Sequence, residues 1–202
     1  MQDYHQLFYK KYLMDVSRRI FDITLLFPGI TFFLLTFPLF AFSIKISSKG
    51  GPVFYSQRRI GRYGKPFMCL KYRTLPSTIV SLKHMDIDNY SNAYITKVGY
   101  FLRKTHLDEV PQLLNILDGT MSFVGPRPEW EKFATKYQQN IPDYKKRYSV
   151  KPGLTGWAQV NYKASNTVPE AQKKLVYDLY YIENMSIFLD IKILIMTLRK
   201  IL

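Results

Sequence analysis

The sequence predicts an α+β protein with an N-terminal re-entrant membrane helix and a compact, mostly helical domain that carries a short β-hairpin and amphipathic interfacial helices. Three observations support this fold class. Residues 23–44 form an apolar run without a charge, two β-patterned segments enclose a glycine-containing loop, and several later segments have apolar residues at helical spacing. At 202 residues the chain has the length of one domain with an appendage, which we divide at residues 1–46 and 47–202.

The apolar run is long enough to cross a bilayer, so a single span is its simplest interpretation. However, basic residues flank the run on both sides, and Lys and Arg favour the cytoplasmic side of a membrane. Pro28 and Pro38 also interrupt the run, and a proline removes a backbone donor and kinks a helix. We therefore favour a re-entrant helix with both ends on the cytoplasmic side. We expect the hydroxyls of Thr24, Thr31 and Thr36 to bind the carbonyls that the prolines leave free.

After the apolar run, residues 47–52 predict a turn. Residues 53–55 and 67–72 predict the two strands of a hairpin around the loop 61–66. Residues 77–94 are polar and aperiodic, which favours a surface loop. Helical spacing then predicts helices at residues 98–103, 108–117, 129–140, 170–182 and 186–202. The last of these is too short and too charged to span a membrane, so it is either a core helix or an interfacial helix.

Positive charge dominates the composition, with 29 Lys and Arg against 15 Asp and Glu and a net charge of +14. This excess predicts an anionic partner, which could be a nucleic acid, acidic lipid head groups or a phosphorylated substrate. The single cysteine, Cys69, excludes an internal disulfide and a cysteine-rich zinc site. P-loop, dinucleotide-binding and GxSxG motifs are absent, which argues against a P-loop enzyme and a serine hydrolase.

Two adjacent carboxylates, Asp108 and Glu109, stand at the start of a predicted helix. Pro111 is tolerated only near a helix start, which places both acids in the first turn. Acidic residues favour this position in any helix because they meet the positive end of its dipole, so capping is the structural alternative. Cationic residues that could meet an anion here are Lys71, Arg73, Arg103 and Arg127.

The acid pair suits phosphoryl chemistry with a metal ion. An ionised Asp108 can attack phosphorus without a general base, and the helix N-terminus is expected to lower its pKa. Neighbouring helical residues point about 100° apart, so the two acids cannot act as a matched pair. One can face phosphorus while the other holds a cation such as Mg²⁺, which typically takes one or two carboxylates plus phosphate oxygens.

Ordered motifs along the chain carry a resemblance to a known family. They lie at residues 19–22, 51–61, 71–75, 102–112, 121–128, 151–162 and 177–182. Together they resemble the small monotopic phosphoglycosyl transferases, the bacterial sugar transferase domain, from Arg18 to the C-terminus. Two positions depart from the family pattern. Leu34-Leu35 replaces the Ser-Pro that breaks the membrane helix, and Thr120 replaces the acid of Gly-Asp-Met-Ser.

The resemblance implies an enzyme that transfers a sugar-1-phosphate from a UDP-sugar to polyprenol (undecaprenyl) phosphate and releases UMP. It implies that Asp108 is the nucleophile of a ping-pong cycle through a covalent phosphosugar intermediate. It further implies that Glu109 is associated with Mg²⁺. The substrate- and phosphate-binding residues expected beside this pair are Lys71, Arg73, Arg103, Arg127 and Gln159.

The resemblance also implies a monotopic protein of the bacterial inner membrane that faces the cytoplasm, contacts the cytoplasmic leaflet and acts in glycoconjugate assembly. A homodimer is a further expectation from homologous enzymes. The main alternative is a membrane-anchored, basic nucleic-acid-binding module. It rests on the net charge and on 16 Tyr and 14 Phe residues, which could stack on bases. This alternative leaves the acid pair unexplained, so we expect no nucleic-acid partner.

Overall fold

The computed structural model describes residues 2–48, 50–76, 95–162 and 167–201, so the loop predicted at 77–94 lies outside the described residues. The helices are α1 (Gln2–Ser47), α3 (Lys97–Lys104), α4 (Gln112–Leu117), α5 (Glu131–Asn140), α6 (Trp157–Asn161), α7 (Val168–Glu183) and α8 (Ile187–Ile201). The strands are β1 (Phe54–Ile60), β2 (Pro66–Tyr72), β3 (Ser122–Val124) and β4 (Gly153–Thr155). This confirms the α+β class, with mostly helical content and a short hairpin.

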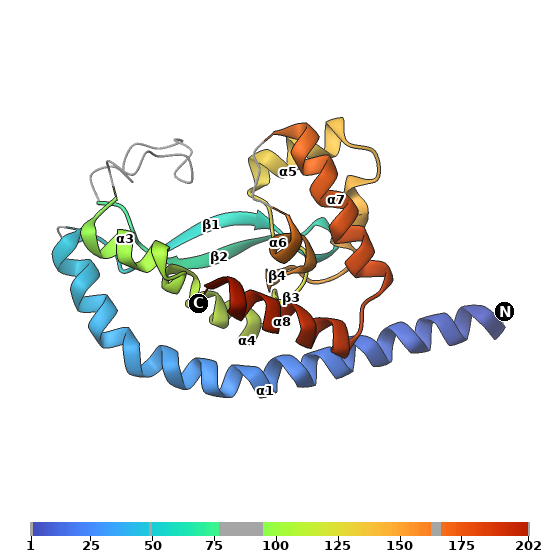
Figure 1. Cartoon of the computed structure of the whole chain (residues 1–202), viewed down its shortest axis with the longest axis horizontal. Coiled ribbons are helices and arrows are strands. Elements are labelled where there is room, and N and C mark those ends of the chain that lie inside the picture. The colour runs from blue at the N-terminus through green and yellow to red at the C-terminus, as the bar shows by residue number, and fades with distance from the viewer. Residues whose placement is uncertain (1, 49, 77–94, 163–166, 202) are drawn as a thin grey trace.

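Helix α1 forms one side of the molecule. It runs without interruption for 46 residues and curves around the rest of the chain, which lies on its concave side (Figure 1). Leu26, Phe33 and Ile44 are buried, whereas Phe27 and Leu35 on other faces are 80% and 77% exposed. By length and composition the helix can cross a membrane. One face of α1 therefore belongs to the protein core while another presents apolar side chains outward.

The prolines of α1 do not break the helix. A proline removes the hydrogen bond to the carbonyl four residues earlier, which here belongs to Thr24 for Pro28 and to Leu34 for Pro38. The threonine hydroxyls were expected to bind those carbonyls, and this prediction was wrong. Each hydroxyl instead donates to a carbonyl three or four residues before it, as Thr31 does to Phe27 at 2.9 Å. Such bonds favour a bent helix, and the curvature of α1 is spread over its length.

A buried arginine fastens α1 to the C-terminal part of the chain. Arg18 is 5% exposed, and its Nε donates to Asp190 Oδ2 of α8 at 2.9 Å. Its Nη2 donates to the Tyr181 hydroxyl at 2.6 Å and to the Val124 carbonyl at 2.6 Å. One turn later, Asp22 accepts from the Ser122 hydroxyl at 2.9 Å. These bonds join α1 to β3, α7 and α8.

The main core cluster lies between α1, the hairpin and the short helices that follow it. Its buried members are Leu26, Phe33, Ile44, Cys69, Tyr72, Leu102, Leu113, Ile116 and Met121. A second cluster joins α5, α7 and the 3-10 segment Tyr144–Ser149, and it buries Tyr137, Tyr144 and Tyr148. Many of the aromatic rings are thus packed inside the protein, where they cannot stack on bases.

Strands β1 and β2 form the predicted antiparallel hairpin, with Tyr55 opposite Lys71. The pairing of β3 with β4 is parallel and was not predicted, because each strand has only three residues. This pair requires glycine for steric reasons. A Cβ on Gly153 would lie 2.1 Å from the amide nitrogen of Gly125. A Cβ on Gly156 would lie 2.1 Å from the carbonyl oxygen of Gly125. The close backbone approach fixes the start of the loop that follows β3.

The predicted helices at residues 98–103, 129–140, 170–182 and 186–202 are confirmed as α3, α5, α7 and α8. The helix predicted at residues 108–117 was wrong in its first part. Residues Leu107–Glu109 form a 3-10 turn, and α4 begins only after Pro111. The turn differs from a helix start because His106, immediately before it, has a left-handed backbone with φ of 57°. The short α6 was not predicted.

Replacing Arg18 by alanine is expected to destabilise the whole protein. The substitution leaves Asp190, which is 1% exposed, as a buried charge without its partner, at a cost of about 3–5 kcal/mol. We expect a lower thermal unfolding midpoint in detergent, and the double variant Arg18→Met, Asp190→Leu should recover much of the loss. Arg199→Ala, on the exposed end of α8, is the control. Equal midpoints for the two alanine variants would contradict the anchoring role of Arg18.

Candidate active site

A cavity of about 230 Å³ lies where the end of β2, the end of α3 and the 3-10 turn Leu107–Glu109 meet. Its charged lining residues are Lys71, Arg73, Arg103, Arg127, Asp108 and Glu109. The structure therefore brings together six of the seven site residues predicted from the sequence. With four cationic and two acidic side chains, the cavity carries an excess of positive charge that suits an anionic ligand.

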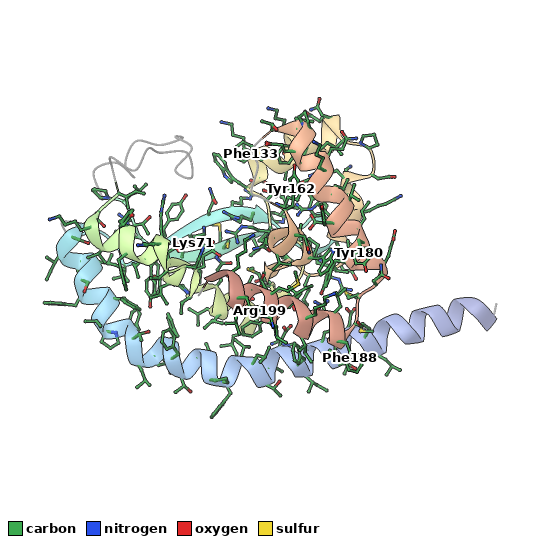
Figure 2. The ribbon with its side chains drawn as sticks, viewed as in Figure 1. Lys71, Phe133, Tyr162, Tyr180, Phe188 and Arg199 are labelled. Atoms are coloured by element: carbon green, nitrogen blue, oxygen red, sulfur yellow. The ribbon has the colours of Figure 1, made fainter. Side chains whose placement is uncertain are left out.

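The hairpin and α3 deliver three of the cations. Lys71 lies near the end of β2 and Arg73 follows that strand (Figure 2 shows Lys71). Arg103 is in the last turn of α3, and its Nε donates to the Thr74 hydroxyl at 3.0 Å. Arg73 is 7% exposed, and its buried Nε has no hydrogen-bond partner in the described part of the chain. A buried donor without an acceptor is costly, so this nitrogen is poised to meet an anion.

Arg127 is held in place through its backbone. It follows β3 in the segment 126–128, and Arg147 Nη2 donates to its carbonyl at 2.9 Å. Arg147 is itself buried and pairs with Asp178 at 2.7 Å. The amide of Gly153 donates to the neighbouring Pro126 carbonyl at 3.1 Å. The loop is therefore fixed from two sides, and the Arg127 side chain reaches the cavity from a rigid support.

Glu109 is clamped by two of these cations. Lys71 Nζ lies 3.0 Å from Glu109 Oε1, and Arg127 Nη1 donates to Oε2 at 3.1 Å. Arg127 Nη2 also donates to Oε1, so the guanidinium and the carboxylate form a bidentate pair. Although burial alone raises the pKa of Glu109, the charges and hydrogen bonds of Arg127 and Lys71 hold it well below the usual value. This side chain is a fixed anion.

Asp108 has the opposite environment. It is 8% exposed and makes no hydrogen bond or ion pair with any described residue. Burial raises its pKa, the charge of Glu109 adds to this effect, and Lys71, Arg103 and Arg127 oppose it. The prediction of a lowered pKa was wrong, because burial outweighs the neighbouring cations, and Asp108 lies in a 3-10 turn ahead of α4. Its carboxylate therefore lies among cations without an ion pair to any of them in the described part of the chain.

Two positions singled out in the sequence lie away from this cavity. Gln159 is in α6, where its Nε2 donates to the Leu154 carbonyl at 3.1 Å, and it does not line the cavity. Its expected role in substrate binding stays a prediction. Thr120 donates to Asp118 Oδ1 and lies next to Gly119, also outside the cavity lining. An acid at position 120, as in the family pattern, would therefore not line this cavity.

Sequence reasoning missed the uncharged part of the cavity wall and His106. The other residues that line it are Tyr55, Tyr72, Thr74 and Leu75. Tyr55 could have been found from strand pairing, because it lies opposite Lys71 in the hairpin register. No pattern in the sequence marks His106, whose place depends on its left-handed backbone conformation.

The Mg²⁺ ion that the resemblance implies would need oxygen ligands in this cavity. In the described residues, no group of three or more His, Cys, Asp and Glu side chains could hold a metal ion. Mg²⁺ usually needs only one or two carboxylates when phosphate oxygens complete its shell. Asp108 has free oxygens, and Glu109 uses three of its roughly four acceptor positions. The free acceptor position of Glu109 therefore fits a Mg²⁺ ion that is bound together with a diphosphate, but the site does not form a metal cage made of protein alone.

The sequence matches a known protein family over most of its length. The model of the family described as bacterial sugar transferase matches residues 13–202, which includes every residue of the cavity. The chain belongs to the bacterial sugar transferase family. The resemblance seen in the sequence motifs is thus confirmed.

Several relatives are similar over most of this chain. The UDP-glucose:undecaprenyl-phosphate glucose-1-phosphate transferase of Escherichia coli (strain K12) is 41% identical over 162 residues, which cover 79% of this chain and 34% of the relative. The sugar transferase EpsL of Bacillus subtilis (strain 168) is 39% identical over 93% of this chain and 88% of the relative.

A third relative, from Aeromonas hydrophila, is a UDP-N-acetylgalactosamine-undecaprenyl-phosphate N-acetylgalactosaminephosphotransferase. It is 38% identical over 79% of this chain and 37% of its own length. This chain thus spans about a third of the Escherichia coli and Aeromonas proteins. Relatives of nearly equal identity are named for different sugars, so overall identity does not distinguish between these sugars.

The clamped Glu109 predicts a pH-dependent contribution to stability. Because its folded-state pKa lies below the unfolded value of about 4.3, the contribution is complete above that pH and is lost as the pH falls through the folded pKa. Glu109→Gln should lower the thermal unfolding midpoint at about pH 7 and narrow its difference from the wild type under more acidic conditions. The control is Glu183→Gln, at the exposed end of α7. A constant difference between wild type and Glu109→Gln at all pH values would contradict this assignment.

Proposed function

We propose that this protein transfers a sugar-1-phosphate from a UDP-sugar to a polyprenol phosphate such as undecaprenyl phosphate. The observation that carries the proposal is the unengaged Asp108 carboxylate in a cavity lined by four cations. The printed names of the Escherichia coli and Aeromonas relatives, which combine a UDP-sugar with undecaprenyl phosphate, support the same two substrates. The cationic lining suits the diphosphate of the first substrate and the phosphate of the second.

In the first step, an oxygen of Asp108 attacks the phosphorus that carries the sugar. The bond from this phosphorus to the bridging oxygen breaks, UMP leaves with that oxygen, and a phosphosugar is bound to Asp108. No general base is needed because the carboxylate is already a nucleophile. Burial favours this step, since a poorly solvated carboxylate with a raised pKa is more basic than one in water.

In the second step, a phosphate oxygen of the polyprenol phosphate attacks the same phosphorus. The bond to Asp108 breaks, the carboxylate is regenerated, and the product is a polyprenyl-diphospho-sugar. Arg73 and Arg103, which have no carboxylate partner among the described residues, are suited to bind the phosphoryl oxygens. Lys71 and Arg127 keep their positions through Glu109, so they add positive charge with little reorganisation.

Glu109 would hold a Mg²⁺ ion together with the diphosphate oxygens of the donor. When bound, the ion would neutralise charge on the phosphoryl oxygens. The contacts of Glu109 support a dual role for this residue. It fixes Lys71 and Arg127, and it retains about one acceptor position toward a cation.

The membrane arrangement is part of the proposal. We infer that α1 enters and leaves the bilayer on one side, which would make the protein monotopic, at the inner membrane and facing the cytoplasm. The concave face of α1 is packed against the domain, so a straight path across a bilayer would require this packing to be lost (Figure 1). Phe188 on α8 is 86% exposed and lies on the same side of the molecule as α1, which supports an interfacial role for α8 (Figure 2).

Replacing Asp108 by asparagine should remove the reaction. We expect UMP release from UDP-glucose or UDP-N-acetylgalactosamine, with undecaprenyl phosphate and Mg²⁺, to fall on the order of 10³-fold or more. Asp118→Asn, which changes an exposed acid outside the cavity, should keep the wild-type rate. Intact-mass measurement of the wild type with donor alone should show the added sugar phosphate. Full activity of Asp108→Asn, with no adduct on the wild type, would refute the proposed mechanism.

Cysteine labelling can test the membrane arrangement. Asp3→Cys and Lys136→Cys place thiols in the first turns of α1 and on the exposed face of α5. With an impermeant maleimide, both should be shielded in spheroplasts and labelled in inverted vesicles. Native Cys69 should add little background, because it is 1% exposed and burial raises its pKa. Labelling of Asp3→Cys alone in spheroplasts would indicate a single span.

A further inference from the structure

A second cavity, of about 200 Å³, lies at the N-terminal half of α1 and shares no lining residue with the candidate active site. Its charged lining residues are Asp15, Arg18, Arg19, Asp22, Arg62 and Lys151. They come from α1, from the turn of the hairpin and from the segment before β4, so the cavity forms only in the folded protein. Cations outnumber acids here by four to two.

Both acids in this cavity are already engaged. Asp15 pairs with Arg62 at 2.7 Å. Asp22 accepts hydrogen bonds from the Ser122 hydroxyl at 2.9 Å and the Phe123 amide at 3.0 Å. The buried Arg18 pairs with Asp190 on α8. Two cations, Arg19 and Lys151, are left without a carboxylate partner among the described residues.

These two cations are close neighbours. Lys151 Nζ and Arg19 Cζ lie 3.4 and 3.9 Å from the point that a Cβ on Gly119 would occupy. Arg19 donates to the carbonyls of Ile116 and Leu117 at 2.6 and 2.7 Å, at the end of α4. Lys151 makes no hydrogen bond or ion pair in the described part of the chain. A half-buried ammonium beside two arginines is electrostatically unfavourable unless an anion joins it.

The pKa of Lys151 reflects these surroundings. Burial lowers it first, Arg19 and Arg62 lower it further, and Asp22 and Asp15 oppose the shift. An anion bound against the ammonium would reverse this effect. A water molecule takes about 30 Å³ in the liquid, so the cavity has room for a group with several oxygens.

The surroundings of the cavity indicate where the anion comes from. Arg19 lies shortly before the uncharged run 23–44 of α1. On the same stretch, Val16 and Ile20 are 39% and 59% exposed, and Leu117 at the end of α4 is 52% exposed. Apolar surface therefore borders the cationic cavity, which suits a molecule with a charged head and a hydrocarbon tail. A free phosphate ion would use the cations but not this surface.

We propose that Arg19 and Lys151 bind the phosphate of an anionic phospholipid from the leaflet that faces the domain, with its acyl chains along Val16, Ile20 and Leu117. The bound lipid is a ligand of the fold and not a substrate of the transfer reaction, so the site does not depend on the proposed function. It places a fixed lipid contact where α1 enters the membrane.

Native mass spectrometry of the full chain from detergent micelles doped with phosphatidylglycerol or phosphatidylcholine can test the site. The wild type should retain one phosphatidylglycerol in preference to phosphatidylcholine. Lys151→Gln should retain it about fivefold more weakly, because one basic residue near an anionic surface contributes about 1 kcal/mol. Lys145→Gln, which removes an exposed charge from the segment Tyr144–Ser149, is the matched control and should behave as the wild type.

The thermal unfolding midpoint of Lys151→Gln in lipid-free detergent should be no lower than that of the wild type, since Lys151 has no described bond to lose and its charge is unfavourable beside Arg19 and Arg62. Three results would overturn the proposal. They are equal retention by wild type and Lys151→Gln, equal loss in Lys145→Gln, and displacement of the lipid by millimolar inorganic phosphate, which would indicate a site for free phosphate.

Discussion

The packing of α1 depends on Arg18, which joins elements that are more than 100 residues apart in the sequence. Burying a charge is unfavourable unless partners replace its water, and this guanidinium has a carboxylate, a hydroxyl and a carbonyl around it. The apolar contacts of α1 with the hairpin and α4 add to this attachment but have no direction of their own. The polar network joins the N-terminal half of α1 to β3, α7 and α8 through bonds with defined directions.

Of the two carboxylates in the candidate active site, only that of Glu109 is held by ion pairs among the described residues. Glu109 satisfies Lys71 and Arg127, and these cations in turn hold its carboxylate. Asp108 is the preceding residue in the chain, yet it has no ion pair with any described residue, because the 3-10 turn directs the two side chains differently. The two adjacent acids can thus have separate roles. Glu109 holds Lys71 and Arg127 in position, and Asp108 remains available to react. The glycines of the β3–β4 pair support this arrangement because they fix the loop that carries Arg127.

Much of this could be read from the sequence, and the failures have physical causes. Long periodic segments such as α7 and α8 were predicted because their burial pattern repeats over many residues. The β3–β4 pair was not, because three-residue strands leave no period and their pairing depends on distant glycines. The cationic residues of the site were predicted as a set, but the clamp on Glu109 could not be, since it needs the distance between a strand end and a loop. The raised pKa of Asp108 depends on burial, which local sequence does not encode.

Helix α1 has a consequence for how this protein can be produced. Leu26, Phe33 and Ile44 belong to the same core cluster as Leu113 and Ile116. The apolar helix therefore forms one side of the hydrophobic core of the domain. A truncated version that starts after Ser47 would expose the rest of this core cluster to water and would also lose the hydrogen bonds of Arg18. The membrane helix is therefore not a detachable anchor. The remainder of the chain can complete its packing only once this helix is in place.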